Sequence, residues 1–286
     1  MNANEIRNKV SNDYARAISA VKPSCCGSQI SCTDSSTAVA ELGTYSTEEI
    51  KTHKSVAASS FGCGNPLAFA DVKEGEVVLD LGSGAGFDLL IASNKVGPTG
   101  KVIGVDMTEA KIDKARQNIK TAGVNNIEVR YGLIEEMPVA TMSVDWVISN
   151  CVVNLSPEKP KVFREIFRVL KPGGRMRISD IVVEKLPAEI RDNQGLYSSC
   201  IAGAVSEDEY LAGLAQAGLT DIRVEERLVY DGAQIKAIFS DGQGCLKDLF
   251  NDLQEEEREE IIDRLISKAA GKVWSAKISA RKSLQE

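Results

Sequence analysis

Residues 77–86 read Val-Val-Leu-Asp-Leu-Gly-Ser-Gly-Ala-Gly, an apolar run that passes directly into a glycine-rich loop. A continuous apolar run is typical of a strand buried on both faces of a parallel sheet. Glycines let the main chain approach a ligand closely, and a helix that begins after the loop would present free N–H groups to that ligand. The stretch therefore predicts a strand, a ligand-binding loop and a helix, although a simple tight strand–helix turn would have the same pattern.

The alternation of strand and helix continues beyond this motif. Apolar runs predict further strands at 101–105, 127–131, 144–149 and 175–181. Helical patterns cover 6–20, 47–58, 109–122, 156–170, 188–203 and 210–217, and the charged segment 246–285 is also helical by pattern. Such alternation predicts an α/β fold in which helices cover both faces of a mostly parallel sheet.

Cap and turn residues predict several boundaries of these elements. Ser156-Pro157 is predicted to start the helix that ends at Leu170, and residues 171–174 are predicted to form the turn after it. Ser206 and Glu209 form a capping box. Asp-Gly at positions 231–232 is a strong hairpin signal. The β-rich segments on either side of it are therefore predicted to pair antiparallel, and they are 222–229 and 235–239.

The length of 286 residues allows one large domain with an appendage, or two small domains. The predicted division is a helical, cysteine-rich segment over 1–60 and a cofactor-binding domain over 61–185. The remainder, 186–286, is predicted to hold an insertion, the terminal hairpin and C-terminal helices.

Composition narrows the classes of partner. The net charge of −7 argues against nucleic acid and anionic membranes, which would repel the chain. No stretch approaches the roughly 20 apolar residues that span a bilayer. The N-terminus is too polar for a signal peptide. We therefore expect a cytoplasmic protein without a membrane or nucleic-acid partner, and a monomer is the expected state.

Charge also indicates the kind of cofactor. Asp106 ends the second predicted strand, where a carboxylate can accept both hydroxyls of a ribose, or simply stand at a helix N-terminus. The loop lacks the Gly-x-Gly-x-x-Gly spacing of dinucleotide-binding folds. Asp80 and Asp88 flank the loop and would repel a pyrophosphate. A cationic ligand fits better, and S-adenosylmethionine carries a sulfonium and an ammonium group.

Residues 78–86, together with the expected terminal antiparallel strand, resemble the class I methyltransferases, and the resemblance covers residues 63–240. It implies a Rossmann-like, seven-stranded sheet, mostly parallel with one antiparallel strand. It also implies that Asp80 and the loop glycines face the methionine part, Asp106 the ribose and Met107 the adenine. The cofactor-binding residues expected on this basis are Asp80, Gly82, Ser83, Gly84, Gly86, Asp106, Met107, Ile134, Glu135 and Asn150.

Cysteines are the candidates for the acceptor site. The chain has seven, at positions 25, 26, 32, 63, 151, 200 and 245, and a single histidine. In a reducing cytosol these cysteines are thiols. Because the chain has one histidine, chemistry based on a histidine general base or a multi-histidine metal site is disfavoured. Cys151 directly follows the fourth predicted strand, and ligands of parallel sheets sit beyond the carboxyl ends of strands. The alternative for Cys151 is a buried, apolar cysteine.

The other cysteines are less constrained by position. Cys200 lies in the predicted insertion, where it could cover the active site or pack within a helix. Cys63 lies between two glycines in a predicted turn. The cluster at 25, 26 and 32 has adjacent cysteines, which suit tetrahedral zinc poorly. Cys245 has no identifiable role beyond packing.

Several short stretches are similar to the arsenite methyltransferase family, and they are 61–64, 104–108, 149–155, 168–174, 178–180 and 200–204. The resemblance implies that Cys151 and Cys200 bind trivalent arsenic and that Cys63 supplies a third thiolate. It also implies a relay in which Cys63 and Cys25 or Cys26 form a disulfide. An external thiol reductant of the thioredoxin or glutathione type would then be required. The chain departs from the simplest family pattern by having three cysteines near its N-terminus.

This chemistry is coherent, because trivalent arsenic is soft and prefers thiolate ligands. Its lone pair can attack the sulfonium methyl without a general base. We therefore expect methylation of arsenite or its thiol conjugates, a detoxification reaction. Two alternatives are a small-molecule C- or O-methyltransferase with packed cysteines and a non-catalytic arsenic- or metal-sequestering protein. The glycine loop and Asp106 argue against the latter, which would need no nucleotide site.

Overall fold

The protein is described here from a computed structural model, which describes residues 2–20, 45, 56, 64–68, 70–184, 201, 203–235 and 254–284. Cysteines 25, 26, 32, 63, 200 and 245 lie outside the described residues. So do the predicted helices over 47–58 and 188–203, apart from single positions. Among the described helices, none is long and apolar enough to cross a membrane.

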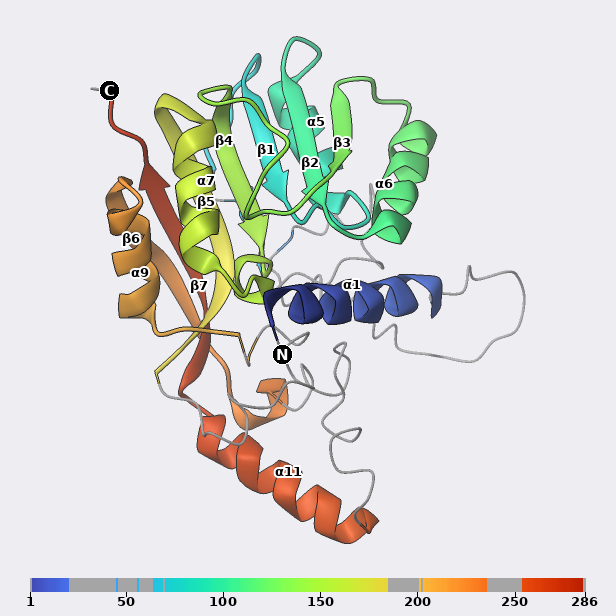
Figure 1. The fold of residues 1–286 in the computed structure, drawn as a ribbon, viewed down its shortest axis with the longest axis vertical. Coiled ribbons are helices and arrows are strands. Elements are labelled where there is room, and N and C mark those ends of the chain that lie inside the picture. The colour runs from blue at the N-terminus through green and yellow to red at the C-terminus, as the bar shows by residue number, and fades with distance from the viewer. Residues whose placement is uncertain are drawn as a thin grey trace.

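The described part of the chain builds a seven-stranded sheet in the order β3-β2-β1-β4-β5-β7-β6 (Figure 1). All neighbouring strands pair parallel except β7, which runs antiparallel to both β5 and β6. The predicted Rossmann-like sheet with one antiparallel strand is therefore confirmed. The strands are β1 Val77–Leu81, β2 Lys101–Asp106, β3 Ile127–Tyr131, β4 Val144–Asn150, β5 Leu170–Val183, β6 Thr220–Val229 and β7 Val273–Arg281.

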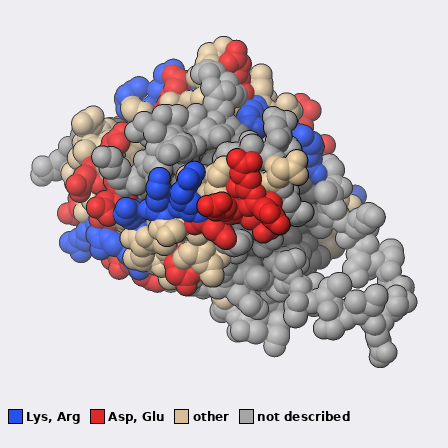
Figure 2. Space-filling view, turned by 90° about the horizontal axis from the view of Figure 1, so that it is seen from below, with Lys and Arg blue, Asp and Glu red and all other residues tan. Residues whose placement is uncertain are grey.

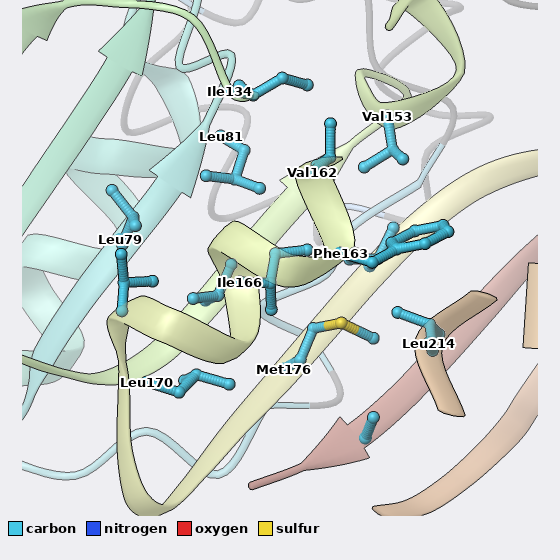
Figure 3. Close-up of a cluster of buried hydrophobic side chains, with 14 of the residues drawn as sticks. Leu79, Leu81, Ile134, Val153, Val162, Phe163, Ile166, Leu170, Met176 and Leu214 are labelled. Atoms are coloured by element: carbon cyan, nitrogen blue, oxygen red, sulfur yellow. The ribbon is translucent and has the colours of Figure 1, made fainter. Parts of the chain in front are cut away.

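Helices cover both faces of this sheet, as the strand–helix alternation predicted. Side chains alternate along β1, so that Val78 packs against α5 while Leu79 and Leu81 pack on the opposite face against α7. Figure 3 shows α7 side chains between β1 and Met176 of β5. The helices are α1 Ala3–Ala20, α5 Phe87–Val96, α6 Glu109–Ala122, α7 Lys159–Val169, α9 Glu207–Gln216 and α11 Glu255–Ala269.

Helix α1 lies across the carboxyl ends of the strands (Figure 1). It confirms the helix predicted over 6–20. Ser206 caps α9, accepting a hydrogen bond from the Glu209 backbone N–H at 3.2 Å, as the capping box predicted.

The predicted terminal hairpin is wrong. Residues 232–235 form a helical turn, because Asp231 and Gln234 make a reciprocal cap. The Gln234 N–H donates to Asp231 Oδ1 at 2.8 Å, and the Asp231 N–H donates to Gln234 Oε1 at 3.0 Å. An Asp-x-x-Gln sequence can thus start a helix as readily as Asp-Gly can close a hairpin. Residues 236–239 of the predicted strand lie outside the described residues.

The partner of β6 comes instead from the segment predicted to be helical throughout. Residues 255–269 do form α11, but 273–281 form β7, which lies between β5 and β6. Ala276, Ile278 and Ala280 belong to the main hydrophobic core, and Ser275 and Ser279 between and beside them are buried as well, so both faces of this strand are covered. Because small and polar residues alternate with few large apolar ones, the sequence of this strand carries no clear strand pattern.

The start of α7 also differs from the prediction. The helix begins at Lys159 after Glu158 as N-cap, with Pro160 in its first turn, and residues 153–155 form a 3-10 turn. Ser156 instead accepts a hydrogen bond from the Glu158 N–H and donates one to Glu135. Residues 171–174, predicted to be a turn, belong to β5 at an irregularity in its pairing with β4.

Candidate functional site

The glycine loop between β1 and α5 forms the floor of the site. Gly82 and Gly84 have φ of 67° and 54°, a left-handed conformation that favours glycine. A Cβ on Gly82 would lie 2.5 Å from a methyl carbon of Val152, so this position has no room for a side chain. The loop therefore needs glycine for both its conformation and its packing.

Asp106 fixes the loop from the end of β2. The Gly84 N–H donates to Asp106 Oδ2 at 3.0 Å, and the Thr108 N–H donates to Asp106 Oδ1 at 2.8 Å. Each carboxylate oxygen thus accepts one backbone hydrogen bond and keeps acceptor capacity on the pocket that Asp106 lines.

Two adjoining pockets open above the loop, enclosing about 490 and 560 Å³ including space open to solvent. They share Tyr14, Gly82, Lys111, Val152 and Leu155.

Nine of the ten predicted cofactor residues line these pockets. The first pocket contains Gly82, Asp106, Met107, Ile134 and Glu135, and the second contains Asp80, Gly82, Ser83, Gly84 and Asn150. Gly86 lines neither. It is the N-cap of α5, and a Cβ there would lie 3.4 Å from Ala115, so Gly86 allows α5 and α6 to pack closely.

Three carboxylates gather at the second pocket and its border. Burial raises the pKa of Asp80 well above its ordinary value, and the nearby Asp88 and Asp106 carboxylates raise it further. Tyr45 donates to Asp88 Oδ1 at 2.8 Å, and burial followed by the Asp88 charge raises the pKa of this tyrosine as well. A cationic ligand would relieve the repulsion among these carboxylates.

The acidic surroundings of the pocket fit the cationic ammonium and sulfonium groups of S-adenosylmethionine. The Ser83 hydroxyl is buried, has no hydrogen-bond partner among the described residues, and lies close to Gly104 of β2.

Cys151 lies at the end of β4 and lines the second pocket beside Asp80 and Gly82. Its side chain is buried, and its φ of 57° is unusual for a residue with a side chain. Its sulfur is disulfide-bonded, which differs from the free thiol that the sequence analysis expected of every cysteine in a reducing cytosol. The other six cysteines lie outside the described residues, and so does the partner of this bond.

A neighbour of one other predicted site cysteine contacts the residue next to Cys151, and a neighbour of another lies in the same hydrophobic cluster as Cys151. Gly64 follows Cys63 in the chain, and its N–H donates to the side-chain oxygen of Asn150 at 3.1 Å. Ile201 follows Cys200 and is buried in the same hydrophobic cluster as Cys151. The described residues thus bring the chain next to Cys63 to the end of β4.

Helix α1 contributes site residues that the sequence analysis missed. Tyr14 lines both pockets, and the Lys111 Nζ lies 3.6 Å from the centre of its ring. Arg7 Nε donates to Glu135 Oε1 at 3.1 Å, and the Arg7 guanidinium also pairs with Glu158. The helix therefore closes over the first pocket. Its amphipathic pattern predicted a helix but could not indicate what the helix covers.

The surface on this side carries charges of both signs. Figure 2, seen from below the view of Figure 1, shows Lys and Arg side chains next to Asp and Glu side chains. On α1, Asp13 pairs with Lys9 at 3.0 Å and with Arg16 at 2.6 Å. The described residues on this face therefore form no large patch of a single sign.

A further buried carboxylate near the site, Asp180 on β5, was also missed as a functional candidate. It accepts hydrogen bonds from the Ile181 N–H at 3.0 Å and the Asn154 N–H at 3.2 Å. Burial raises the pKa of Asp180 to about 7, although these hydrogen bonds and Lys159 act in the opposite direction.

Comparison with known proteins agrees with this geometry. A family of methyltransferase domains matches residues 72–218. An arsenite methyltransferase of Halobacterium salinarum is 47% identical over 181 residues, covering 63% of this chain and 46% of the relative. The human arsenite methyltransferase is 39% identical over 174 residues, covering 57% of this chain and 46% of the relative. The matched stretches thus span about half the length of these curated relatives.

A solved structure extends the similarity to the whole fold. It is an arsenic(III) S-adenosylmethionine methyltransferase from Chlamydomonas reinhardtii, with 31% sequence identity and a TM-score of 0.60. The match covers 87% of this chain and 73% of that chain.

Proposed function

Because the chain belongs to the arsenite methyltransferase family within the methyltransferase-domain proteins, we propose that it transfers methyl groups from S-adenosylmethionine to trivalent arsenic bound by cysteine thiolates. The observation that carries the proposal is the position of Cys151. Its side chain lines the same pocket as Asp80 and the glycine loop, so an ion held there would lie beside the bound cofactor.

The proposed cofactor residues follow from the chemistry of the two pockets. Asp80 and the glycine loop would hold the amino-acid part, and Asp106 would accept hydrogen bonds from the ribose hydroxyls. Met107 and Ile134 would contact the adenine from the first pocket. When bound, the cofactor supplies an electrophilic methyl group on its sulfonium.

The proposed arsenic ligands are Cys151, Cys200 and Cys63, with Cys25 or Cys26 as the N-terminal partner in the relay. The hydrogen bond between Gly64 and Asn150 supports the approach of Cys63. Cys200 is proposed from the family resemblance. Thiolates are the ligands that soft, trivalent arsenic prefers. Each ligand must lose its proton to bind, so arsenic binding releases protons.

Methyl transfer then requires orientation rather than proton transfer. The bound cofactor would supply a methyl cation equivalent, the arsenic would supply the electron pair, and protein or external thiols would supply the two electrons that return arsenic to the trivalent state, becoming a disulfide. Cys151 would keep the arsenic close to the methyl carbon, which is worth several orders of magnitude in rate. The buried carboxylates would orient the cofactor.

The disulfide at Cys151 adds a reductive step to this cycle. A sulfur in a disulfide cannot bind arsenic, so the bond must be opened by thiol–disulfide exchange before arsenite can enter. An external dithiol of the thioredoxin type, or glutathione, would supply the two electrons and become a disulfide itself.

The direct test is transfer of a labelled methyl group to arsenite in the presence of a thiol reductant. Cys151→Ser should abolish arsenite methylation while the dissociation constant for S-adenosylmethionine stays unchanged. Cys245→Ser is the matched control and should keep its activity. Transfer to a quinone-type acceptor but not to arsenite would favour the small-molecule alternative, and arsenite binding without any transfer would favour sequestration.

A further inference from the structure

The loop that carries Cys151 is hydrogen-bonded to β5 at both of its ends. At its start, the Cys151 N–H donates to the Ser179 carbonyl at 2.8 Å. At its end, the Asn154 N–H donates to Asp180 Oδ2 at 3.2 Å, and Asn154 Nδ2 donates to the Ile181 carbonyl at 2.6 Å. The two ends of the loop are thus tied to three consecutive residues of one strand.

Apolar packing supports the same loop from beneath. Val153 is fully buried and lies near Val162 and Phe163 of α7 (Figure 3). The Lys159 Nζ donates to the Asn154 carbonyl at 3.2 Å. The loop therefore has an apolar anchor and a polar anchor, while Cys151 faces the pocket.

The conformation of Cys151 explains why such anchoring is needed. Its φ of 57° lies in the left-handed region, which costs a residue with a side chain free energy. Strained conformations of this kind persist only where the surroundings determine them. Without the anchors, the backbone at Cys151 would relax and its sulfur would leave the pocket.

We propose that Asp180 is a positioning residue for arsenic binding, which through Asn154 holds the Cys151 loop in the conformation that directs the thiol into the cofactor pocket. This inference rests on the proposed function and deepens it. Asp180 itself is fully buried and lines neither pocket, so its effect on the reaction must pass through the loop.

The test is Asp180→Asn, which keeps the volume of the side chain and removes one acceptor oxygen. The KM for arsenite should rise about 10- to 100-fold, the range typical of groups that orient a ligating side chain. The dissociation constant for S-adenosylmethionine should stay within about twofold of the parent. Site-resolved alkylation of reduced protein should show a changed rate at Cys151.

Two further variants keep the test decisive if Asp180→Asn folds poorly. Asn154→Ala removes only the side-chain bond to the Ile181 carbonyl and should raise the arsenite KM in the same direction. Tyr210→Phe removes the longer bond to Asp180, at 3.4 Å, while the bond to the Asn154 N–H remains, so its effect should be small.

The outcomes separate this inference from the proposed function. An unchanged arsenite KM and Cys151 alkylation rate in Asp180→Asn and Asn154→Ala would overturn the positioning role, and so would an equal loss of cofactor and arsenite binding. If Cys151→Ser still methylates arsenite, the proposed function is wrong, whatever the Asp180 and Asn154 variants show.

Discussion

Asn150 and Gly64 exchange a pair of hydrogen bonds across the end of β4. The Gly64 N–H donates to Asn150 Oδ1 at 3.1 Å, and Asn150 Nδ2 donates to the Gly64 carbonyl at 2.5 Å. Each residue adjoins a cysteine, Cys151 after Asn150 and Cys63 before Gly64. The amide therefore links the two chain segments that the proposed arsenic site needs to bring together.

Asn150→Asp should weaken that link. The substitution replaces a donor by an acceptor opposite the Gly64 carbonyl and adds a charge near Asp88. Loss of a buried hydrogen bond costs about 1–3 kcal/mol, so kcat/KM for arsenite should fall about tenfold or more. Steady-state kinetics with labelled cofactor measure this fall in kcat/KM. Asn126→Asp makes the same change at a side chain that bonds the Gly97 carbonyl and lines neither pocket, and it should leave kcat/KM unchanged. Equal kinetics in both variants would contradict the link.

The ion pair between α1 and the pocket wall predicts a second effect, on cofactor affinity. Arg7 and Glu135 are 12% and 6% exposed, so Arg7→Ala leaves a nearly buried carboxylate without its guanidinium. Helix α1 should dock less tightly, and the Kd for S-adenosylmethionine should rise about three- to tenfold by calorimetry. Arg16→Ala, on the same helix but 78% exposed, should not change the Kd. If Arg7→Ala binds S-adenosylmethionine as tightly as Arg16→Ala and the parent protein do, α1 does not close the pocket.

The first half of the fold could be predicted from the sequence because its signals are local. The apolar run of β1, the glycine loop and Asp106 each lie within a few residues of the feature they specify. Nine of the ten residues predicted from that motif and the family resemblance line the two pockets, and their roles toward the cofactor stay predictions. Gly86 lines neither pocket and instead allows α5 to pack closely on Ala115 of α6.

The remaining features depend on contacts that are distant in the chain. Strand β7 fills a gap between β5 and β6, and its Ala, Ser and Lys residues do not signal a strand by themselves. Arg7 and Tyr14 gain their roles only when α1 crosses the strand ends. In the sequence, Asp180 is only a residue near the end of a predicted strand. Its hydrogen bond from the Asn154 N–H forms only when the loop after β4 folds against β5.

A third prediction concerns the pH dependence of cofactor binding. The raised pKa of Asp80 means that this carboxyl takes up a proton at a higher pH than an ordinary aspartate. The protonated form loses its attraction for a cationic ligand, so the affinity for S-adenosylmethionine should fall as the pH falls. Asp80→Asn should bind weakly at every pH, with a flatter profile. Asp113→Asn, on the exposed side of α6, should follow the parent, and a parallel profile for Asp80→Asn would exclude this carboxyl as the titrating group.

Asp180 predicts a dependence of stability on pH with a defined sign. Its pKa is about 7 in the folded protein, against about 3.9 in an unfolded chain. Between these values the folded state keeps the proton that the unfolded state has lost, so the free energy of unfolding should decrease as the pH rises from about 4 to about 7 and then level off. Asp180→Asn cannot titrate, so the difference in unfolding free energy between parent and variant should change across that interval, by an amount on the order of a few kcal/mol.

Urea unfolding of both proteins over this range measures this difference. Taking the difference between parent and variant cancels the contributions of all groups that titrate equally in the two proteins. A difference that stays constant with pH would mean that Asp180 is already ionised in the folded protein at low pH, held by the Asn154 and Ile181 N–H groups more strongly than burial opposes it.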